Sequence, residues 1–165
     1  MAIATLRELY IDQLQDLYSA NRQSLEATRK MREKASEQDL QSALDDGVKG
    51  IEDGMKQVKD LIERHDAEPT GEFCKGMEGL VKEAKAHALD ANIEDKDVRD
   101  ASIITQYQRM VHYGIAGYGT AAAFAKRLGL TDDAATIARC LEETYDGDRR
   151  MNKIAEREVN PAAAA

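Results

Sequence analysis

The chain has few of the residues that interrupt helices or cross-link a fold. It contains two prolines and two cysteines in 165 residues. Ala, Glu, Asp, Lys, Leu and Gln are abundant instead, and this composition favours helix along nearly the whole chain. Cys74 and Cys140 lie far apart, outside any CxxC or zinc-ligand spacing. We therefore interpret both as reduced structural thiols.

Long apolar runs and an excess of positive charge are also missing. No apolar run approaches the ~18 residues that a membrane span requires. The first apolar stretch contains Arg7, Glu8 and Asp12, so it does not form a signal-peptide core. The formal net charge of -8 disfavours binding to nucleic-acid backbones and to anionic membranes. We expect a cytoplasmic protein with neither kind of partner.

The length and apolar content predict one helical domain. With 165 residues and 42% hydrophobic content, the chain can bury a single core. We expect that domain to span residues 1–159, followed by a disordered tail at 160–165. Amphipathic spacing, caps and glycines predict helices over about 5–34, 39–65, 73–89, 98–129 and 131–157. Thr5 and Glu8 have the spacing of a capping box, and Thr131 is the expected N-cap of the last helix.

The stretch from Ile103 to Gly119 is the expected central helix of the bundle. Residues 104, 111, 115, 118 and 122 share one face at helical spacing, and Gln108 falls in the same stripe. Hydrogen-bonding aromatic side chains are unusually dense here: Tyr107, His112, Tyr113 and Tyr118. This composition is typical of a bundle that holds, or once held, a polar site.

Glycines form a second unusual pattern. Gly47, Gly50 and Gly54 lie along one stripe of the second predicted helix, where a missing side chain lets another backbone or a bulky aromatic ring approach. Gly114, Gly117 and Gly119 weaken the central helix in a similar way. Close packing is the simplest explanation, and a glycine-lined wall of a small-ligand pocket is the alternative.

Several blocks of the chain resemble one known family. LRELYIDQLQDLYSAN, FCKGMEGLVKEA, VRDASIITQYQRMVHYGIAGYGT and LEETYDGD are similar to the YciE/YciF family of the ferritin-like superfamily, from Leu6 to about Ala155. The most specific pieces are GMEGL at 76–80 and HYGIAGYGT. The resemblance implies an all-α fold, a ferritin-like antiparallel four-helix bundle whose crossover carries a short extra helix. It also implies membership of a bacterial group linked to stress responses and often named as candidate ferroxidases.

The sequence departs from the di-iron pattern of that superfamily. Such centres use about four carboxylates and two histidines, typically with Glu-x-x-His on two helices. None of the three histidines here has an acidic residue three positions before it. At positions where relatives carry ligands, this chain has Asn21, Gly47, Lys49, Gly50, Gly54, Val111, Gly114 and Thr144.

We therefore expect no cofactor and a centre converted into a hydrogen-bonded layer. The residues assigned to this layer are Asn21, Tyr107, Gln108, Tyr145 and Asp148. If a residual metal site exists, its candidate ligands are Glu52, His112, Glu143 and Asp148.

Three functions remain open on these grounds. The first is a non-catalytic, stress-associated structural or interaction protein that forms a homodimer or higher homo-oligomer. The second is an oxidoreductase, either a ferroxidase or a peroxide-handling enzyme, with iron in a rearranged site and Tyr107 or Tyr113 as a redox-active neighbour. The third is a small-ligand binder that uses the glycine-lined faces.

Overall fold

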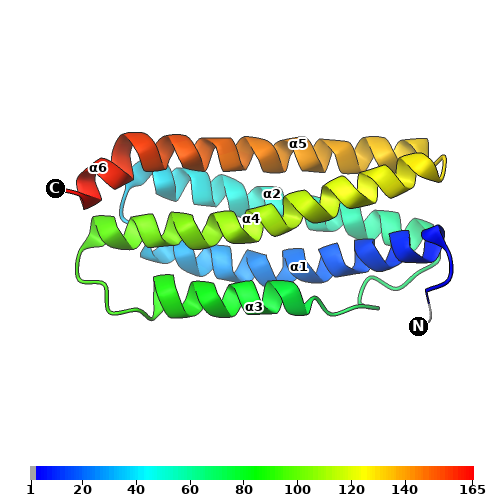
Figure 1. Cartoon of the computed structure of the whole chain (residues 1–165), viewed down its shortest axis with the longest axis horizontal. Helices are drawn as coiled ribbons and strands as arrows, with labels where there is room; N and C mark the ends of the chain where they lie inside the picture. The colour runs from blue at the N-terminus through cyan, green and yellow to red at the C-terminus, as the bar shows by residue number, and fades with distance from the viewer. Residues whose placement is uncertain (1–2) are drawn as a thin grey trace.

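The computed structural model describes residues 3–165 and consists of helices (Figure 1). The four long helices are α1 (Leu6–Lys34), α2 (Gln38–Arg64), α4 (Lys96–Arg127) and α5 (Thr131–Ile154). The crossover between α2 and α4 carries α3 (Lys75–Ala84), which continues as a π-helical turn over Lys85–Leu89. No strand occurs in the described part of the chain, so the predicted all-α class is confirmed.

The crossover sets the direction of the second helix pair. It returns along the length of the bundle, so α4 starts at the same end as α2 (Figure 1). As a result α2 and α4 run in one direction, and α1 and α5 run in the other. Each long helix packs against two antiparallel neighbours, α1 against α2 and α4, and α5 against α4 and α2. This is the predicted ferritin-like topology.

Most helix ends follow from local sequence. Glu8 N–H donates to Thr5 Oγ1 over 3.2 Å, and the Glu8 carboxylate accepts from Thr5 N–H at 2.8 Å, which confirms the capping box. Gly129 has a φ of 73° directly after α4, the left-handed conformation expected of a residue that ends a helix. At α5 the prediction was wrong, because Leu130 packs against the core and becomes the N-cap, which places Thr131 inside the first turn.

The end of the chain also differs from the expected disordered tail. The helical path continues from α5 through a π-helical turn over Ala155–Val159 into α6 (Asn160–Ala163). Val159 is buried, and α6 lies beside α4. Contact with the bundle therefore holds residues that composition alone assigned to a tail.

Two apolar clusters fill the bundle, one toward each end. The first surrounds Met31, Leu44 and Ile103 and includes the inner face of α3. The second surrounds Leu14, Ile62 and Ile137. No helix within residues 3–165 is long and apolar enough to cross a bilayer.

The buried face of α4 is turned relative to the expected stripe. Ile104 and Tyr118 are buried as expected, but Val111, Ile115 and Ala122 are only half-buried. Ile103, Tyr107, Met110, Ala121 and Ala125 are buried instead. The shift arises because α4 is covered by α3 as well as by α1 and α5.

Candidate functional site

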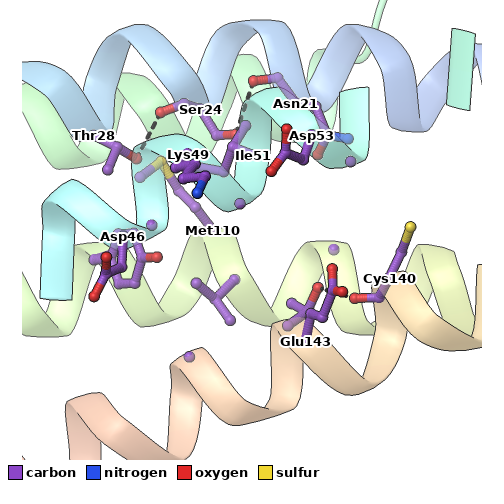
Figure 2. A pocket seen from close by; sticks show the side chains of 18 of the residues that line it. Asn21, Ser24, Thr28, Asp46, Lys49, Ile51, Asp53, Met110, Cys140 and Glu143 are labelled. Carbon is purple, nitrogen blue, oxygen red and sulfur yellow. Dashed lines mark hydrogen bonds between the residues drawn. The ribbon is translucent and has the colours of Figure 1, made fainter. Parts of the chain in front are cut away.

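A cavity of about 460 Å³ lies between α1, α2, α4 and α5, between the two apolar clusters (Figure 2). Asn21, Ser24 and Thr28 line it from α1, and Met110 lines it from α4. Most other lining residues are apolar or small: Ala20, Ala43, Ile51, Met77, Val111, Cys140 and five glycines. The cavity therefore lies in the core of the bundle, between facing helices, where helix bundles can hold ligand or metal sites.

Two of the α2 glycines make room for tyrosines that reach across the bundle from α4. A Cβ atom on Gly47 would collide with the hydroxyl of Tyr107. A Cβ atom on Gly54 would lie 2.9 Å from the hydroxyl of Tyr118, closer than real Cβ contacts allow. These positions bear out the expectation that missing side chains in the glycine stripe admit bulky aromatic rings.

The remaining glycines of the cavity have a different surrounding. A Cβ atom on Gly50 of α2 or on Gly147 of α5 would meet no atom within 4 Å. Both residues line the cavity. A Cβ atom on Gly114 of α4 would make only ordinary contacts, the nearest at 3.9 Å. The empty space therefore lies beside glycines from three helices, which larger side chains would fill.

Tyr118 closes one end of the cavity and is hydrogen-bonded. Asn21 Nδ2 donates to its hydroxyl oxygen over 2.7 Å, and both side chains are buried. Burial raises the pKa of Tyr118, so its phenol stays neutral. The bond joins α1 to α4 across the core.

Tyr107 lies toward the other end and has no such partner. The side chain is 5% exposed, and its hydroxyl forms no hydrogen bond within residues 3–165. Burial, with a smaller contribution from the Asp148 carboxylate, raises the pKa of Tyr107 to about 12. The hydroxyl is thus a neutral donor that opens onto the cavity.

The other small polar groups are already satisfied by their own helices. Ser24 and Thr28 donate to backbone carbonyls one turn earlier in α1, over 3.1 and 2.8 Å. Thr144 donates to the carbonyl of Cys140 over 2.6 Å. Inside the cavity, away from its mouth, the polar character therefore comes from two tyrosines and one asparagine.

The cavity opens between α2 and α5, where its lining becomes charged. Four carboxylates and two cationic groups lie at this mouth: Asp46, Asp53, Glu143, Asp146, Lys49 and Arg150. Arg150 forms an ion pair with Asp46 at 2.5 Å. In Figure 2, Asp53 of α2 and Glu143 of α5 lie on opposite sides of the opening. The mouth carries more negative than positive groups.

Comparison with known proteins places this architecture in a family. Residues 5–164 match the family model described as a domain of unknown function, DUF892. The chain belongs to this family. Protein YciF of Escherichia coli (strain K12) is 30% identical over 164 residues, which cover 99% of this chain and 98% of YciF. The resemblance to the YciE/YciF family is thereby confirmed.

Solved structures of two relatives share the fold. The crystal structure of the E. coli stress protein YciF aligns with a TM-score of 0.89 at 30% identity, over 96% of this chain and 99% of that chain. The structure named "YcfI, a putative structural protein from Rhodopseudomonas palustris" aligns with a TM-score of 0.86 at 32% identity. This alignment covers 93% of the present chain and 96% of the YcfI chain. This DUF892 chain therefore shares the helical bundle of these relatives over more than nine-tenths of its length.

The residues expected to form one hydrogen-bonded layer lie in three separate places. Asn21 and Tyr107 both line the cavity, but Asn21 is bonded to Tyr118. Gln108 donates to Asp148 over 3.0 Å, at the edge of the bundle between α4 and α5. Tyr145 does not belong to the layer, because it is 38% exposed.

The position of Tyr145 follows from helix geometry. The inward side of α5 carries Ile137, Cys140 and Met151, and Thr144 and Gly147 line the cavity. Tyr145 is one residue after Thr144, which turns its side chain about 100° away from that side. It lies beside the Arg149 guanidinium instead, 5.9 Å from ring centroid to Cζ.

The four candidate metal ligands do not converge either. Glu52 is exposed and forms an ion pair with Arg29 at 2.5 Å. His112 Nε2 lies 3.1 Å from the Asp148 carboxylate, and Glu143 is at the mouth of the cavity. Across residues 3–165, no three His, Cys, Asp or Glu side chains form a group that could hold a metal ion. A di-iron centre needs about six such ligands in one layer, so these residues do not fit one.

Sequence reasoning missed a second buried polar group, at the end of the bundle. Asp133 is 4% exposed and accepts hydrogen bonds from Tyr10 Oη over 3.0 Å and Arg64 over 3.0 Å. His65 Nε2 lies 2.6 Å from the same carboxylate. No local sequence pattern links these residues, because they come from α1, α2 and α5.

Proposed function

We propose that this protein is a non-catalytic ferritin-like bundle that acts as a structural or interaction protein under stress and has lost the di-iron centre. Two relatives support the general direction, since YciF is called a stress protein and the name of YcfI proposes a structural role. The proposal for this chain depends on its own central residues.

The observation that carries the proposal is the lining of the central cavity. Two iron ions bring several positive charges into the core, and bridging carboxylates must compensate them. Of the four candidate ligands, Glu143 alone lines the cavity. The neighbouring inward positions carry Asn21, Gly50, Gly114 and Thr144. Three further carboxylates line the mouth, Asp46, Asp53 and Asp146, but within residues 3–165 no three His, Cys, Asp or Glu side chains come together as metal ligands. The donors therefore do not form the shared layer that two irons need.

A single contact favours the alternative of a rearranged oxidoreductase site. His112 Nε2 and the Asp148 carboxylate are 3.1 Å apart, close enough to bind the same metal ion. The imidazole is 60% exposed, however, and Asp148 also accepts from Gln108. A bound ion at this pair would need further ligands from solvent or from another chain. The pair is therefore better explained as a surface hydrogen bond between α4 and α5.

The location and the assembly belong to the same proposal. The net charge of -8 supports a cytoplasmic protein that binds neither nucleic acid nor membrane. We propose that it self-associates as a homodimer or a higher homo-oligomer. Sedimentation velocity at several protein concentrations tests this part, and a monomer at every concentration contradicts it.

Metal analysis tests the central part of the proposal. The protein is purified from iron-supplemented and iron-free medium, its iron is measured, and oxygen-dependent Fe(II) oxidation is assayed beside a ferroxidase-active ferritin. We expect no stoichiometric iron and no oxidation above buffer. Asp148→Ala is the matched variant, since it removes the carboxylate beside His112 and should change neither result. Two irons per chain with turnover would establish the enzyme instead.

A further inference from the structure

The unpaired hydroxyl of Tyr107 is the starting point. The Tyr107 side chain is only 5% exposed. Its hydroxyl reaches the cavity because Gly47 has no Cβ atom to block it. The hydroxyl has no hydrogen-bond partner within residues 3–165, and it is not one of the fully buried polar atoms left without a partner. Its oxygen is therefore accessible from the cavity that Tyr107 lines. A bound molecule with an acceptor oxygen would satisfy it.

Tyr118 supplies a second donor from the far end of the same space. Its oxygen accepts from Asn21, and no acceptor for its own proton occurs in the described part of the chain. Tyr107 and Tyr118 are eleven residues apart on α4, which corresponds to about 16 Å along the helix. The cavity thus has a phenol donor toward each end and an apolar middle.

The volume and lining set the size and polarity of the occupant. At about 460 Å³, the cavity has about three times the volume of an engineered cavity that holds benzene. It falls within the range of small-molecule sites, which are mostly apolar with a few placed polar groups. The middle is lined by Ile51, Met110 and Val111 and by the open glycines Gly50 and Gly147. The occupant is therefore a largely apolar molecule of roughly two or three rings.

The charges at the mouth select against anions. Of the four carboxylates there, Asp46 is paired with Arg150 and Asp146 with Arg149. Asp53, Glu143 and Lys49 remain, which leaves a small excess of negative charge. An anionic ligand would pass unpaired carboxylates such as Asp53 and Glu143, which form no ion pair within residues 3–165. Like charges at a narrow opening oppose entry.

We propose that the central cavity is a binding site for a neutral or cationic, largely apolar organic molecule that carries a carbonyl oxygen, and that Tyr107 donates a hydrogen bond to this oxygen. Tyr118 provides the second donor, and the glycines of α2 and α5 provide the space. This inference goes beyond the proposed loss of a metal centre. Its test uses organic probes without metal, so the binding-site proposal and the proposed loss of the metal centre can fail independently.

Prodan, a neutral two-ring ketone whose emission reports its surroundings, is the first probe. Titrated into the full chain, it should bind saturably at one site per chain and emit at shorter wavelength than in water. Dimethylaminonaphthalene lacks the ketone and should bind about fivefold more weakly, because one hydrogen bond from a neutral donor is lost. The anionic anilinonaphthalene sulfonate should also bind more weakly than prodan.

Three variants distinguish probe binding in the cavity from probe binding on the surface. Tyr107→Phe should weaken prodan binding about fivefold and leave dimethylaminonaphthalene unchanged. Gly147→Leu projects a side chain into open space and should weaken both probes by at least about tenfold. Gly79→Leu is the matched control, because Gly79 lies on the exposed side of α3 with nothing within 4 Å. It should change neither affinity.

The proposal fails on any of three results. These are prodan binding that does not saturate, equal loss of both probes in Tyr107→Phe, or undiminished binding in Gly147→Leu. Circular dichroism establishes that each variant is folded. If Gly147→Leu does not fold, Gly50→Leu fills the same cavity from α2. Undiminished prodan binding in this second variant also overturns the proposal.

Discussion

Two regions of this bundle bury tyrosines, and they treat the phenol group in opposite ways. At the end of the bundle, the hydroxyl of Tyr10 donates to Asp133 over 3.0 Å, and the ring packs edge-on against His65 with centroids 5.7 Å apart. In the middle, the hydroxyl of Tyr107 faces a cavity without a partner. Both side chains are at least 95% buried, with exposed fractions of 0% and 5%.

The difference lies in the supply of acceptors. The Asp133 carboxylate receives donors from α1 and α2 and therefore ties three helices together. The middle of the bundle has one comparable bond, from Asn21 to Tyr118. A fully satisfied buried network adds rigidity, whereas a hydroxyl that opens onto a cavity keeps its hydrogen-bonding capacity for a bound molecule. We infer that the end of the bundle is structural and that the middle is adapted to bind.

The largest expected effect comes from removing the acceptor at the end of the bundle. Asp133→Ala leaves the buried Tyr10 hydroxyl and the His65 ring without their partner, and should lower the free energy of unfolding by about 3 kcal/mol. Urea denaturation followed by circular dichroism measures this loss. The contribution of Arg64 is small because its side chain is 53% exposed.

Asp132→Ala is the control for that substitution. Asp132 precedes Asp133 in the first turn of α5 but is exposed, so its loss removes only a favourable interaction with the helix dipole, about 0.5 kcal/mol. Equal losses in the two variants would show that Asp133 acts as a first-turn charge and not as the centre of a network.

An intermediate effect is expected where the middle of the bundle does make a bond. Gly54→Ala places a Cβ atom 2.9 Å from the Tyr118 hydroxyl and should displace it from Asn21. Strain and the lost bond outweigh the helix propensity of alanine, so we expect a net loss of about 1 kcal/mol in urea denaturation.

Gly79→Ala is the matched control, since its Cβ atom would meet nothing within 4 Å. It should stabilise the protein by about 0.5–1 kcal/mol through helix propensity alone. In a Tyr118→Phe background, Gly54→Ala should become stabilising as well, because the colliding oxygen is gone. If it stays destabilising there, the glycine is required by something other than the tyrosine.

The smallest effect is expected for Tyr107→Phe, and Tyr10→Phe is the variant to compare it with. Tyr10→Phe removes a hydroxyl bonded to Asp133 and should cost about 1–1.5 kcal/mol. Tyr107→Phe removes a hydroxyl without a partner, so we expect a change within about 0.5 kcal/mol or a slight gain. Thermal and urea denaturation of both variants at neutral pH measure the difference. A cost for Tyr107→Phe equal to that for Tyr10→Phe would mean that its hydroxyl has a structural partner.

Sequence patterns predicted the elements well because their signals are local. The capping box of α1 needs only Thr5 and Glu8, which lie within four consecutive residues. The left-handed Gly129 is a similar local signal. The glycine stripe on α2 also led to the correct idea that bulky rings approach it.

The candidate site was harder to predict, because its members come from four helices. Tyr145 and Tyr107 look alike in the sequence, yet one is exposed beside Arg149 and the other is buried. The partner of Asn21 is Tyr118, 97 residues away. Helix rotation and the path of the crossover decide such pairings, and neither is encoded in the spacing within one helix.

The sequence by itself determined that the chain forms helices, where most of them begin and end, and which family it belongs to, because propensity, capping and characteristic motifs act over a few residues at a time. The tertiary structure alone decided which polar side chains meet. Burial removes water as a partner, so the fate of each hydroxyl depends on what the other helices bring to it. At Asp133 they bring an acceptor, and at Tyr107 they leave a cavity.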